Sequence, residues 1–433
     1  MAAGKGSRMT DVTCGKAKCL LPVGGLPLLW YPLNMLRSAG FTEVIVIVPD
    51  SVKAEVVKLP ERFDLNLKLD VVAIPGQDAE LGTADSLRFV HEKLTGGDVI
   101  VVSGDVILED ADSFRGLVNL HRRKSSAVTS LLATPCLDLK AVSGTVPGPK
   151  TTKYKRERDL IGLKEDQLVF FMAEADVEDE EVRVSRKVLQ RVGNLTVNSN
   201  LVDAHIYIFK KWICDYLASD PNISTIKGEL LPILVRKQFS KATARAEEDT
   251  EKSSLTDFVL PETQSVGLSS VPQSQLYSCY AFTSSAPCYR VNTMPAYWHC
   301  NKEMMRDTRL EPSAVVGEKA ALTKCSVSKD CVIADKTTLN GVSLGQGSRV
   351  EEKVRITNTV IMDNVLVKSG SVLEVRSFVV KLFGLKNLLR IALLATVVSS
   401  VRSPDSKCLS LERSKQQNQK LRSVSSSSSI RIV

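Results

Sequence analysis

Ala2-Ala3-Gly4-Lys5-Gly6-Ser7-Arg8-Met9-Thr10 opens the chain, and Lys18-Cys19-Leu20-Leu21-Pro22-Val23 follows it closely. Gly4 and Gly6 lack a Cβ atom, so their backbone amides can approach an anion closely. Arg8 and Lys18 supply cations that can neutralise a triphosphate. The spacing matches neither the dinucleotide-binding fingerprint, which has a third glycine at a helix start, nor the P-loop. Because a Gly-x-Gly turn alone is weak evidence, the rest of the chain must decide whether this turn binds phosphate.

Helix-like and strand-like segments alternate after this turn. Apolar residues recur at helical spacing from Pro27 to Ser38, Gly40 is placed to end that helix, and Thr42 to Val48 is a β-branched stretch. The cycle recurs in strands at 69–74, 98–102 and 204–209 and in helices at 83–93 and 210–217. The alternation predicts an α/β domain with a mostly parallel sheet and helices on both faces. We expect its ligand site at the carboxyl ends of the strands, with Asp105 and Gly4 on that rim.

A period of six residues replaces this alternation beyond Glu311. Apolar residues stand six apart in three runs, which are Val315, Ala321, Val327, Ile333 and Leu339; then Leu344, Val350 and Ile356; then Val360, Leu366 and Val372. This period is typical of hexapeptide repeats that coil into a parallel β-helix, with loops at the phase slips after Leu339 and Ile356. Irregular strands with chance spacing are the alternative. A β-helix leaves open ends and flat faces that pair with other chains, so a partner protein is expected.

Length and composition divide the chain further. With 433 residues and 43% hydrophobic content, two or three globular domains are expected. We predict a first domain at 1–305 containing a mobile polar loop at about 241–275, a left-handed β-helix at 311–373, and an atypical, disordered tail at 374–433. Residues 378–398 are apolar, but Lys381, Lys386 and Arg390 argue against a membrane span there.

Charge and cysteine usage exclude several classes of protein. The net charge of +8 is spread along the chain apart from a basic run at 150–158, whereas a nucleic-acid binder would show a broad basic face with interleaved aromatic residues. The ten cysteines form no C-x-x-C pair and the four histidines are scattered, so neither a zinc site nor a disulfide framework is suggested. Because no secretory signal pattern precedes the first motif, we expect a cytosolic protein.

Several motifs together resemble the sugar-phosphate nucleotidyltransferases. These are the Gly-x-Gly-x-Arg turn, the Lys-x-Leu-Leu-Pro-Val segment, Leu81-Gly82-Thr83-Ala84-Asp85-Ser86, and Gly104-Asp105, followed by the hexapeptide coil. This superfamily includes active pyrophosphorylases, such as mannose-1-phosphate guanylyltransferase, and the gamma and epsilon subunits of eukaryotic translation initiation factor 2B. The chain is more similar to the gamma type, notably in Leu29-Trp30-Tyr31-Pro32-Leu33-Asn34, Val202-Asp203-Ala204-His205 and the segment 234–240.

The resemblance implies a metal site that this chain does not complete. Active members hold a divalent cation with two carboxylates, of which Asp105 matches the first. The second lies in an Asp-x-Gly-Thr segment, and the corresponding stretch here is Arg290-Val291-Asn292-Thr293. An Arg in that position reverses the charge where the cation would sit. A Glu-Lys-Pro element that holds the sugar phosphate corresponds to Glu174-Ala175-Asp176, which lacks the Lys and enters an acidic run that is either a solvated loop or repels the substrate. No catalytic residue, metal or cofactor is therefore expected.

The resemblance also implies a strand ahead of Ala2. The sheet would then lack its first, central strand, which would leave neighbouring backbone groups unpaired. We hypothesise on this ground that the chain is an alternative or incomplete product, and its departure from the repeat after Leu373 fits the same hypothesis.

The implied function is that of a non-catalytic gamma-type subunit. It would assemble with epsilon-type and other subunits of initiation factor 2B and support the exchange of GDP for GTP on initiation factor 2, with no direct contact to nucleic acid or membrane. An active guanylyltransferase and a regulatory nucleotide-binding protein are the alternatives. A vestigial nucleotide site would comprise Gly4, Gly6, Arg8, Lys18, Gly82 and Asp105. Arg8 and Lys18 could instead form structural ion pairs with Asp11 or Asp105.

Overall fold

The protein is described by a computed structural model that covers residues 1–4, 6–13, 15–74, 81–135, 159–173, 184, 186–239, 277–374 and 378–379. The basic run at 150–158, the acidic run at 174–181, the polar loop at 241–275 and almost all of the tail lie outside these residues. The chain forms two compact units, of which the first ends at Asn301 and the second begins at Lys302.

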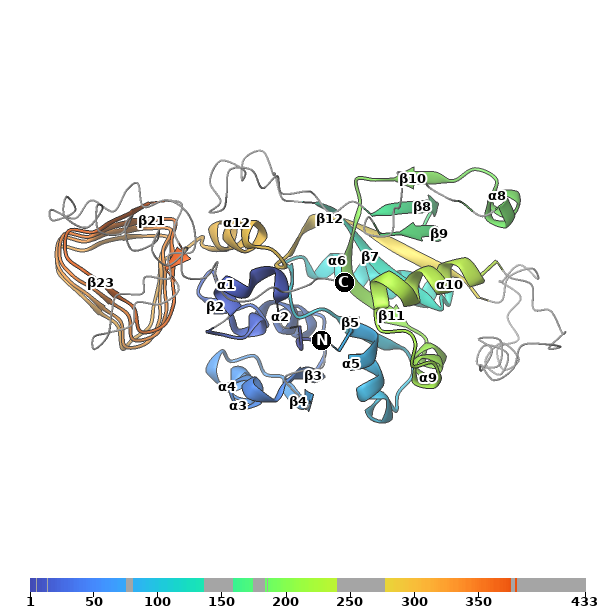
Figure 1. The fold of residues 1–433 in the computed structure, drawn as a ribbon, viewed down its shortest axis with the longest axis horizontal. Coiled ribbons are helices and arrows are strands. Elements are labelled where there is room, and N and C mark those ends of the chain that lie inside the picture. Colours follow the sequence, from blue (N-terminus) through green and yellow to red (C-terminus); the bar gives the residue numbers. More distant parts are fainter. Residues whose placement is uncertain are drawn as a thin grey trace, which may run out of the picture. The chain divides into compact units, whose positions relative to one another are not determined.

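Two sheets form the centre of the first unit (Figure 1). β3 (Glu43–Pro49) pairs in parallel with β4 (Lys68–Ile74) in a two-stranded sheet. The larger sheet has the strand order β10-β8-β9-β12-β7-β11-β5, with β6 beside β12. Its strands are β5 (Val99–Val102), β6 (Val106–Leu108), β7 (Val128–Pro135), β8 (Leu160–Lys164), β9 (Gln167–Met172), β10 (Thr196–Asn198), β11 (Val202–Phe209) and β12 (Cys279–Arg290).

The larger sheet is mixed, which corrects the prediction of a mostly parallel sheet. β12 runs parallel to β7, but β11 lies antiparallel between β5 and β7, and β8, β9 and β10 pair antiparallel with their neighbours. Strands that are covered on both faces are apolar throughout, whichever way their neighbours run. The predicted strand at 204–209 is therefore real, but its sequence could not reveal its direction.

Helices cover both faces of the larger sheet, as predicted. One face packs against α5 (Thr83–Phe89), α9 (Lys211–Ser219) and α10 (Leu231–Lys237), in a core that contains Leu87, Ile213 and Leu234. The opposite face packs against α2 (Trp30–Ser38) and α6 (Ala111–Lys124), through Met35 and Phe114. The shorter elements of this unit are η1 (Ser7–Met9), α1 (Thr10–Thr13), η2 (Lys18–Leu20), β1 (Pro22–Val23), β2 (Leu26–Pro27), η3 (Asp50–Val52), α3 (Lys53–Val57), α4 (Leu59–Arg62), η4 (His91–Lys93), α8 (Arg186–Val192) and η6 (Ile226–Leu230).

Local contacts explain where α6 and α2 begin. The carboxylate of Asp110 accepts hydrogen bonds from the amides of Asp112 and Ser113, which caps the start of α6. The helix predicted at 27–38 begins only at Trp30, because Leu26–Pro27 pairs with Pro22–Val23 in a short hairpin. α12 (Met294–Met304) then leads out of this unit.

The second unit is the predicted parallel β-helix (Figure 1). Every strand pairs in parallel with the strand one coil further on, which makes three sheets of order β13-β16-β19-β22-β25, β14-β17-β20-β23 and β15-β18-β21-β24. The strands are β13 (Arg309–Leu310), β14 (Val315–Val316), β15 (Ala321–Thr323), β16 (Ser326–Val327), β17 (Val332–Ile333), β18 (Thr338–Asn340), β19 (Ser343–Leu344), β20 (Arg349–Val350), β21 (Arg355–Thr357), β22 (Val360–Ile361), β23 (Leu366–Val367), β24 (Val372–Glu374) and β25 (Phe378–Val379).

The coil repeats every 17 residues from β13 to β24, since Val315 pairs with Val332 and Val332 with Arg349, and the step from Val360 to Phe378 is one residue longer. This corrects part of the predicted register. The inward residues follow steps of six, six and five, and they include Val316, Leu322, Ile361, Val367 and Leu373. Val315, Ala321, Val360, Leu366 and Val372 were each predicted one residue too early, and Val315 and Leu366 are 60% and 36% exposed. One side of each coil is shorter by a residue, so a strict six-residue count drifts out of phase.

Left-handed backbone conformations mark the corners of the coil. One corner has positive φ at Lys324, Gly341 and Asn358, which are spaced by one coil. A second corner has positive φ at Asp330, Gly347 and Asn364, which are also spaced by one coil. Gly and Asn tolerate this conformation best, so the corners fix the repeat.

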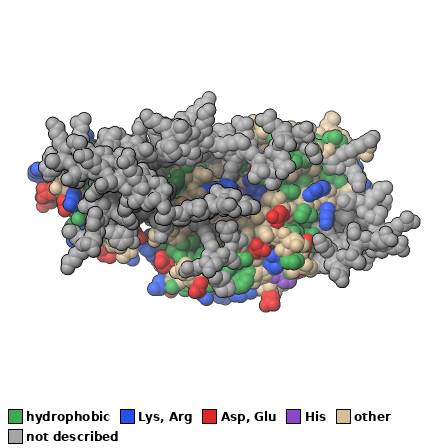
Figure 2. Space-filling model, in the orientation of Figure 1, with side chains coloured by type: hydrophobic (Ala, Val, Ile, Leu, Met, Phe, Trp, Pro, Cys, Tyr) green, Lys and Arg blue, Asp and Glu red, His purple; other side chains and the backbone are tan. Residues whose placement is uncertain are grey.

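β25 continues the stack beyond Leu373, where the sequence repeat was predicted to stop. Among the described residues, no helix is long and apolar enough to cross a membrane. Acidic and basic side chains are interspersed over the described part of the face shown in Figure 2.

Candidate functional site

Asp105 lies at the carboxyl end of β5, on the rim where the sequence places it. Its carboxylate is buried and contacts three neighbouring side chains. Lys18 Nζ donates a hydrogen bond to Oδ2, and Ser103 Oγ donates one to Oδ1 at 2.6 Å. Arg290 Nε lies 3.8 Å from Oδ2. The carboxylate is therefore held between two cations of the chain itself.

The opening turn encloses Lys18. Gly6 adopts the left-handed conformation with a φ of 72°, which favours glycine. A Cβ atom at Gly6 would lie 2.9 Å from Thr13 Cγ2 and 3.5 Å from Lys18 Cβ, so the turn packs against the stem of the lysine. The side chain of Lys18 is 14% exposed. The turn thus directs the ammonium group of Lys18 towards Asp105.

Arg290 reaches Asp105 from the end of β12. It is the last residue of β12 and pairs with Val106 of β6, directly after Asp105. Val291 N also donates a hydrogen bond to Asp105 O at 2.8 Å. The sequence motif Arg290-Val291-Asn292-Thr293 and the Gly104-Asp105 motif therefore meet, as predicted.

The electrostatics of Asp105 favour its charged form. Burial by itself raises the pKa of this carboxyl group, but the charges of Lys18 and then Arg290 outweigh burial. Hydrogen bonds from Lys18 and Ser103 act in the same direction, so the pKa lies well below its ordinary value. Asp105 is ionised at neutral pH, and its charge is balanced without any added cation.

The chain offers a divalent cation a poor site at this point. Hard cations bind groups of oxygen ligands with net negative charge. Asp105 contributes one carboxylate, while Lys18 and Arg290 contribute two positive charges around it. Among the described residues, no group of three His, Cys, Asp or Glu side chains is arranged to hold a metal ion. The residues present therefore do not fit the metal that nucleotidyl transfer requires.

Gly82 lies at the start of α5, where the backbone of a distant segment covers it. A Cβ atom at Gly82 would come within 2.0 Å of Ser224 O. Gly82 N donates to Asp85 Oδ2 at 2.9 Å, and Ala84 N donates to Ser224 O at 2.9 Å. Protein groups thus satisfy these two donors at the helix N-terminus.

Arg88 completes the attachment of α5 to the same segment. Its guanidinium donates to the backbone oxygens of Leu217, Asp220 and Ile223 at 2.7 to 2.9 Å, and to Asp85 Oδ1 at 2.6 Å. The Gly82-Thr83-Ala84-Asp85-Ser86-Leu87-Arg88 motif therefore has a structural role here. No described contact joins Gly82 to Lys18 or Asp105.

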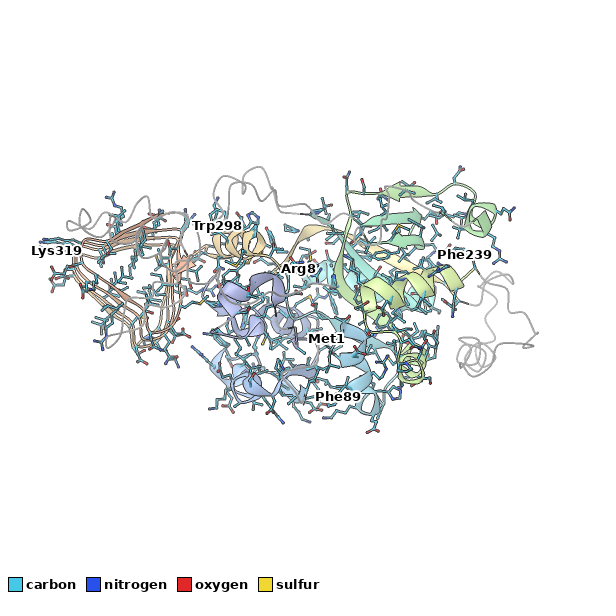
Figure 3. All side chains as sticks on the ribbon, in the orientation of Figure 1. Met1, Arg8, Phe89, Phe239, Trp298 and Lys319 are labelled. Atoms are coloured by element: carbon cyan, nitrogen blue, oxygen red, sulfur yellow. The ribbon has the colours of Figure 1, made fainter. Side chains whose placement is uncertain are left out.

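The remaining two predicted residues lie on the surface. Gly4 is exposed, and a Cβ atom there would meet nothing within 4 Å. Arg8 is also exposed; Figure 3 labels it. Of the six predicted residues, the structure brings together Gly6, Lys18 and Asp105. The alternative in which Lys18 pairs with Asp105 is observed, while the side chain of Asp11 is outside those described.

A second charged cluster, which sequence reasoning did not assign to the site, lies on and beside β11. Asp203 N donates to Asp159 Oδ2 at 3.1 Å, and Lys227 Nζ lies 2.9 Å from the same oxygen. Tyr207 OH donates to Asp203 Oδ2. Burial raises the pKa of Asp203 to about 6, and the charge of Lys227 opposes that rise. The signal in the sequence was an Asp and a His in an otherwise apolar strand.

His205 links the two clusters. It has a φ of 55° at an irregularity in the pairing of β11 with β7, and its backbone oxygen accepts a hydrogen bond from Ser103 N at 3.1 Å. Burial lowers the pKa of His205 well below its ordinary value, and the charges of Arg290 and Lys227 lower it further. The imidazole is therefore neutral at pH 7.

Comparison with known proteins is consistent with this geometry. The nucleotidyl transferase family model matches residues 1–138. The chain is 29% identical over 347 residues to translation initiation factor eIF2B subunit gamma of Schizosaccharomyces pombe, which covers 78% of this chain and 71% of the relative. The Dictyostelium discoideum protein of the same name is 26% identical over 362 residues, covering 77% and 81%. The Caenorhabditis elegans protein is 31% identical over 245 residues, covering 55% and 57%.

Proposed function

We propose that this chain, which is a homologue of the eIF2B gamma subunits and has a nucleotidyltransferase fold at its N-terminus, acts as a non-catalytic gamma-type subunit of translation initiation factor eIF2B. The names of its relatives support the role in translation initiation. The ion cluster of Lys18, Asp105 and Arg290 supports the non-catalytic assignment, since two positive charges of the chain surround the carboxylate that the resemblance matches to a metal ligand.

In this proposal the nucleotidyltransferase-like domain serves as a scaffold. Lys18 and Arg290 tie the opening turn and β12 to Asp105, and Arg88 ties α5 to the segment after α9. These contacts hold the rim of the sheet in one conformation without a nucleotide. The proposed function is indirect support for release of GDP and uptake of GTP by initiation factor 2, in the cytosol.

The partners we propose are an epsilon-type subunit and the other subunits of the complex. The β-helix presents flat faces, and its outward residues Val315 and Val332 are 60% and 39% exposed in neighbouring coils. Exposed apolar side chains of this kind are common at protein interfaces. No direct contact with nucleic acid or membrane is part of the proposal.

Co-expression with an epsilon-type subunit tests the assembly. We expect a stable complex on size-exclusion chromatography and faster GDP release from initiation factor 2 than the epsilon-type subunit gives alone. A chain that stays monomeric in the presence of that subunit would contradict the proposal.

The alternative function is that of an active sugar-phosphate nucleotidyltransferase, and the family match over residues 1–138 favours it. Incubation of the purified chain with Mg²⁺, nucleoside triphosphates and hexose phosphates tests this alternative. Pyrophosphate release above that of an Asp105→Ala control would establish the enzyme and overturn the non-catalytic assignment. Calorimetry with the nucleotides alone tests the third possibility, a regulatory nucleotide site at Gly4, Gly6, Arg8 and Lys18.

A further inference from the structure

One corner of the β-helix carries the same pair of charges in three successive coils. The corner joins β14 to β15, β17 to β18 and β20 to β21, and in each coil an acidic residue precedes a lysine. The three acidic residues, here called the acidic column, are Glu318, Asp335 and Glu352. The lysine column consists of Lys319, Lys336 and Lys353, of which Figure 3 labels Lys319. The charge pattern at this corner therefore repeats with the period of the coil.

Each column is a stack of like charges. β14 pairs with β17 and β15 with β18 on either side of the corner, so the coils stay in register there. Backbone contacts continue through the corner itself, since Lys353 N donates to Asp335 O at 3.4 Å and Gly370 N donates to Glu352 O at 3.1 Å. Neighbouring strands lie about 4.8 Å apart, and like charges directly opposite each other on such strands are destabilising. Opposite charges brought to each column would relieve this repulsion.

The six side chains are accessible to such opposite charges. All six are exposed. Within the part of the chain that the structure describes, none of them forms an ion pair or a side-chain hydrogen bond, not even with its neighbour in the sequence. Exposed ion pairs do form elsewhere in the protein, as between Lys68 Nζ and Glu43 Oε1 at 2.7 Å. The corner thus presents two columns of opposite charge side by side.

This arrangement makes the corner complementary to itself. In a symmetric dimer the same surface of both copies meets around a two-fold axis. A two-fold axis parallel to the axis of the β-helix exchanges left and right and keeps the order of the coils, so the acidic column of each copy faces the lysine column of the other. A two-fold axis that runs along the strands keeps left and right, and it would place like charges opposite each other. The charges therefore select the first arrangement.

We propose that this corner is a contact between two copies of the chain, whose β-helices lie side by side with parallel axes. The acidic residue of each coil then pairs with the lysine of the same coil in the second copy, as Asp335 does with Lys336 of that copy. Exposed ion pairs are individually weak and are screened by salt, so the dimer is weak and salt-sensitive. The proposal rests on the β-helix alone and does not depend on the proposed function.

Sedimentation equilibrium of the full chain at two salt concentrations tests the contact. We expect a dimer whose association constant falls by about tenfold or more when the ionic strength rises from about 0.01 to about 0.15 M, because the Debye length shortens from about 30 to about 8 Å. A parent chain that is monomeric at both ionic strengths would overturn the proposal, as would a dimer that is equally stable at both.

An exchange of charges in the middle coil tests the proposed pairing directly. Asp335→Lys and Lys336→Glu each place like charges opposite each other twice in the dimer, so neither variant should dimerise alone. An equimolar mixture of the two variants should form a heterodimer, because every lysine of the first then faces an acidic residue of the second. The chain that carries both substitutions should regain the dimer of the parent, because its two columns are exchanged in that coil.

Lys329→Glu is the matched control. Lys329 is also exposed and lies at another corner of the coil, between β16 and β17, so its substitution changes the net charge by the same amount as Lys336→Glu. We expect its dimer to match that of the parent. Dimers that survive Asp335→Lys and Lys336→Glu, or a mixture of these two variants that stays monomeric, would overturn the proposed contact.

Discussion

Arg290 Nε lies 3.8 Å from Asp105 Oδ2, the same carboxylate oxygen that accepts a hydrogen bond from Lys18 Nζ. Arg290 ends β12 and Asp105 directly precedes β6, and they meet because these two strands pair. A guanidinium at this distance stabilises the ionised carboxylate, and together with Lys18 it repels an added cation. Lys18 and Arg290 therefore balance the negative charge of Asp105 within the chain itself.

Removal of Lys18 should destabilise the protein strongly. The Lys18–Asp105 pair is nearly buried, with side chains 14% and 9% exposed. The Lys18→Met substitution therefore leaves the buried carboxylate of Asp105 without the positive charge of its ion-pair partner. We expect the free energy of unfolding to fall by about 3 kcal/mol in urea denaturation. Lys68→Met is the matched control, because the pair of Lys68 with Glu43 is 78% and 68% exposed and its loss should have no measurable effect. Equal effects of the two substitutions would contradict the structural role of Lys18.

Asp203 should make stability depend on pH in the weakly acidic range. Burial raises its pKa to about 6 in the folded state, so the folded protein binds more protons than the unfolded chain above the ordinary carboxyl pKa. The contribution of Asp203 is most favourable below about pH 4 and is lost as the pH rises through 6. The side chain of Asn in the Asp203→Asn variant cannot ionise. The free energy of unfolding of this variant, relative to that of the parent, should therefore rise by up to about 3 kcal/mol between pH 4 and 7. A constant difference between the two unfolding curves across this range would refute the assignment.

Gly82→Ala tests the close approach at the start of α5. The added Cβ atom would lie 2.0 Å from Ser224 O, which is backbone and cannot move cheaply. We expect a loss of about 1–3 kcal/mol or a local rearrangement, seen as a lower thermal midpoint. Gly4→Ala is the control, because its Cβ atom would meet nothing within 4 Å. An unchanged midpoint for Gly82→Ala would mean that the segment around Ser224 does not lie on α5.

A pair of neighbouring substitutions tests the register of the β-helix. Val367 is 4% exposed and belongs to the core of the coil, whereas Leu366 is 36% exposed. Val367→Ala removes two buried methyl groups and should cost about 2 kcal/mol. Leu366→Ala should change stability by less than about 0.5 kcal/mol, although it removes more carbon atoms. A larger loss of stability for Leu366→Ala than for Val367→Ala would mean that Leu366 faces inward, as the strict six-residue count predicts.

The six-residue period was predicted correctly, but for some strands the sequence did not show which of two neighbouring residues faces inward. Ile333, Leu339, Leu344, Val350 and Ile356 are inward as predicted, because two of the three faces do advance by six residues. The third face is one residue shorter, and the sequence hides this where two neighbours are both apolar, as in Val315–Val316 and Val360–Ile361. Only the pairing between coils distinguishes them.

The amino-acid sequence by itself predicted the helix and strand alternation at 27–48, 69–102 and 204–217, the six-residue period and the rim position of Asp105, because hydrophobic periodicity and short turn motifs are local properties. It did not predict α6 or the strands β7, β8, β9 and β12. The resemblance to the nucleotidyltransferases added that Arg290 is a cation in place of a carboxylate. The tertiary structure decided the direction of β11, the use of Gly82 and Arg88 for packing, and the choice of Asp105 as the partner of Lys18. These features depend on which distant segments meet, and a contact between residues far apart in the chain leaves no periodic trace in the sequence.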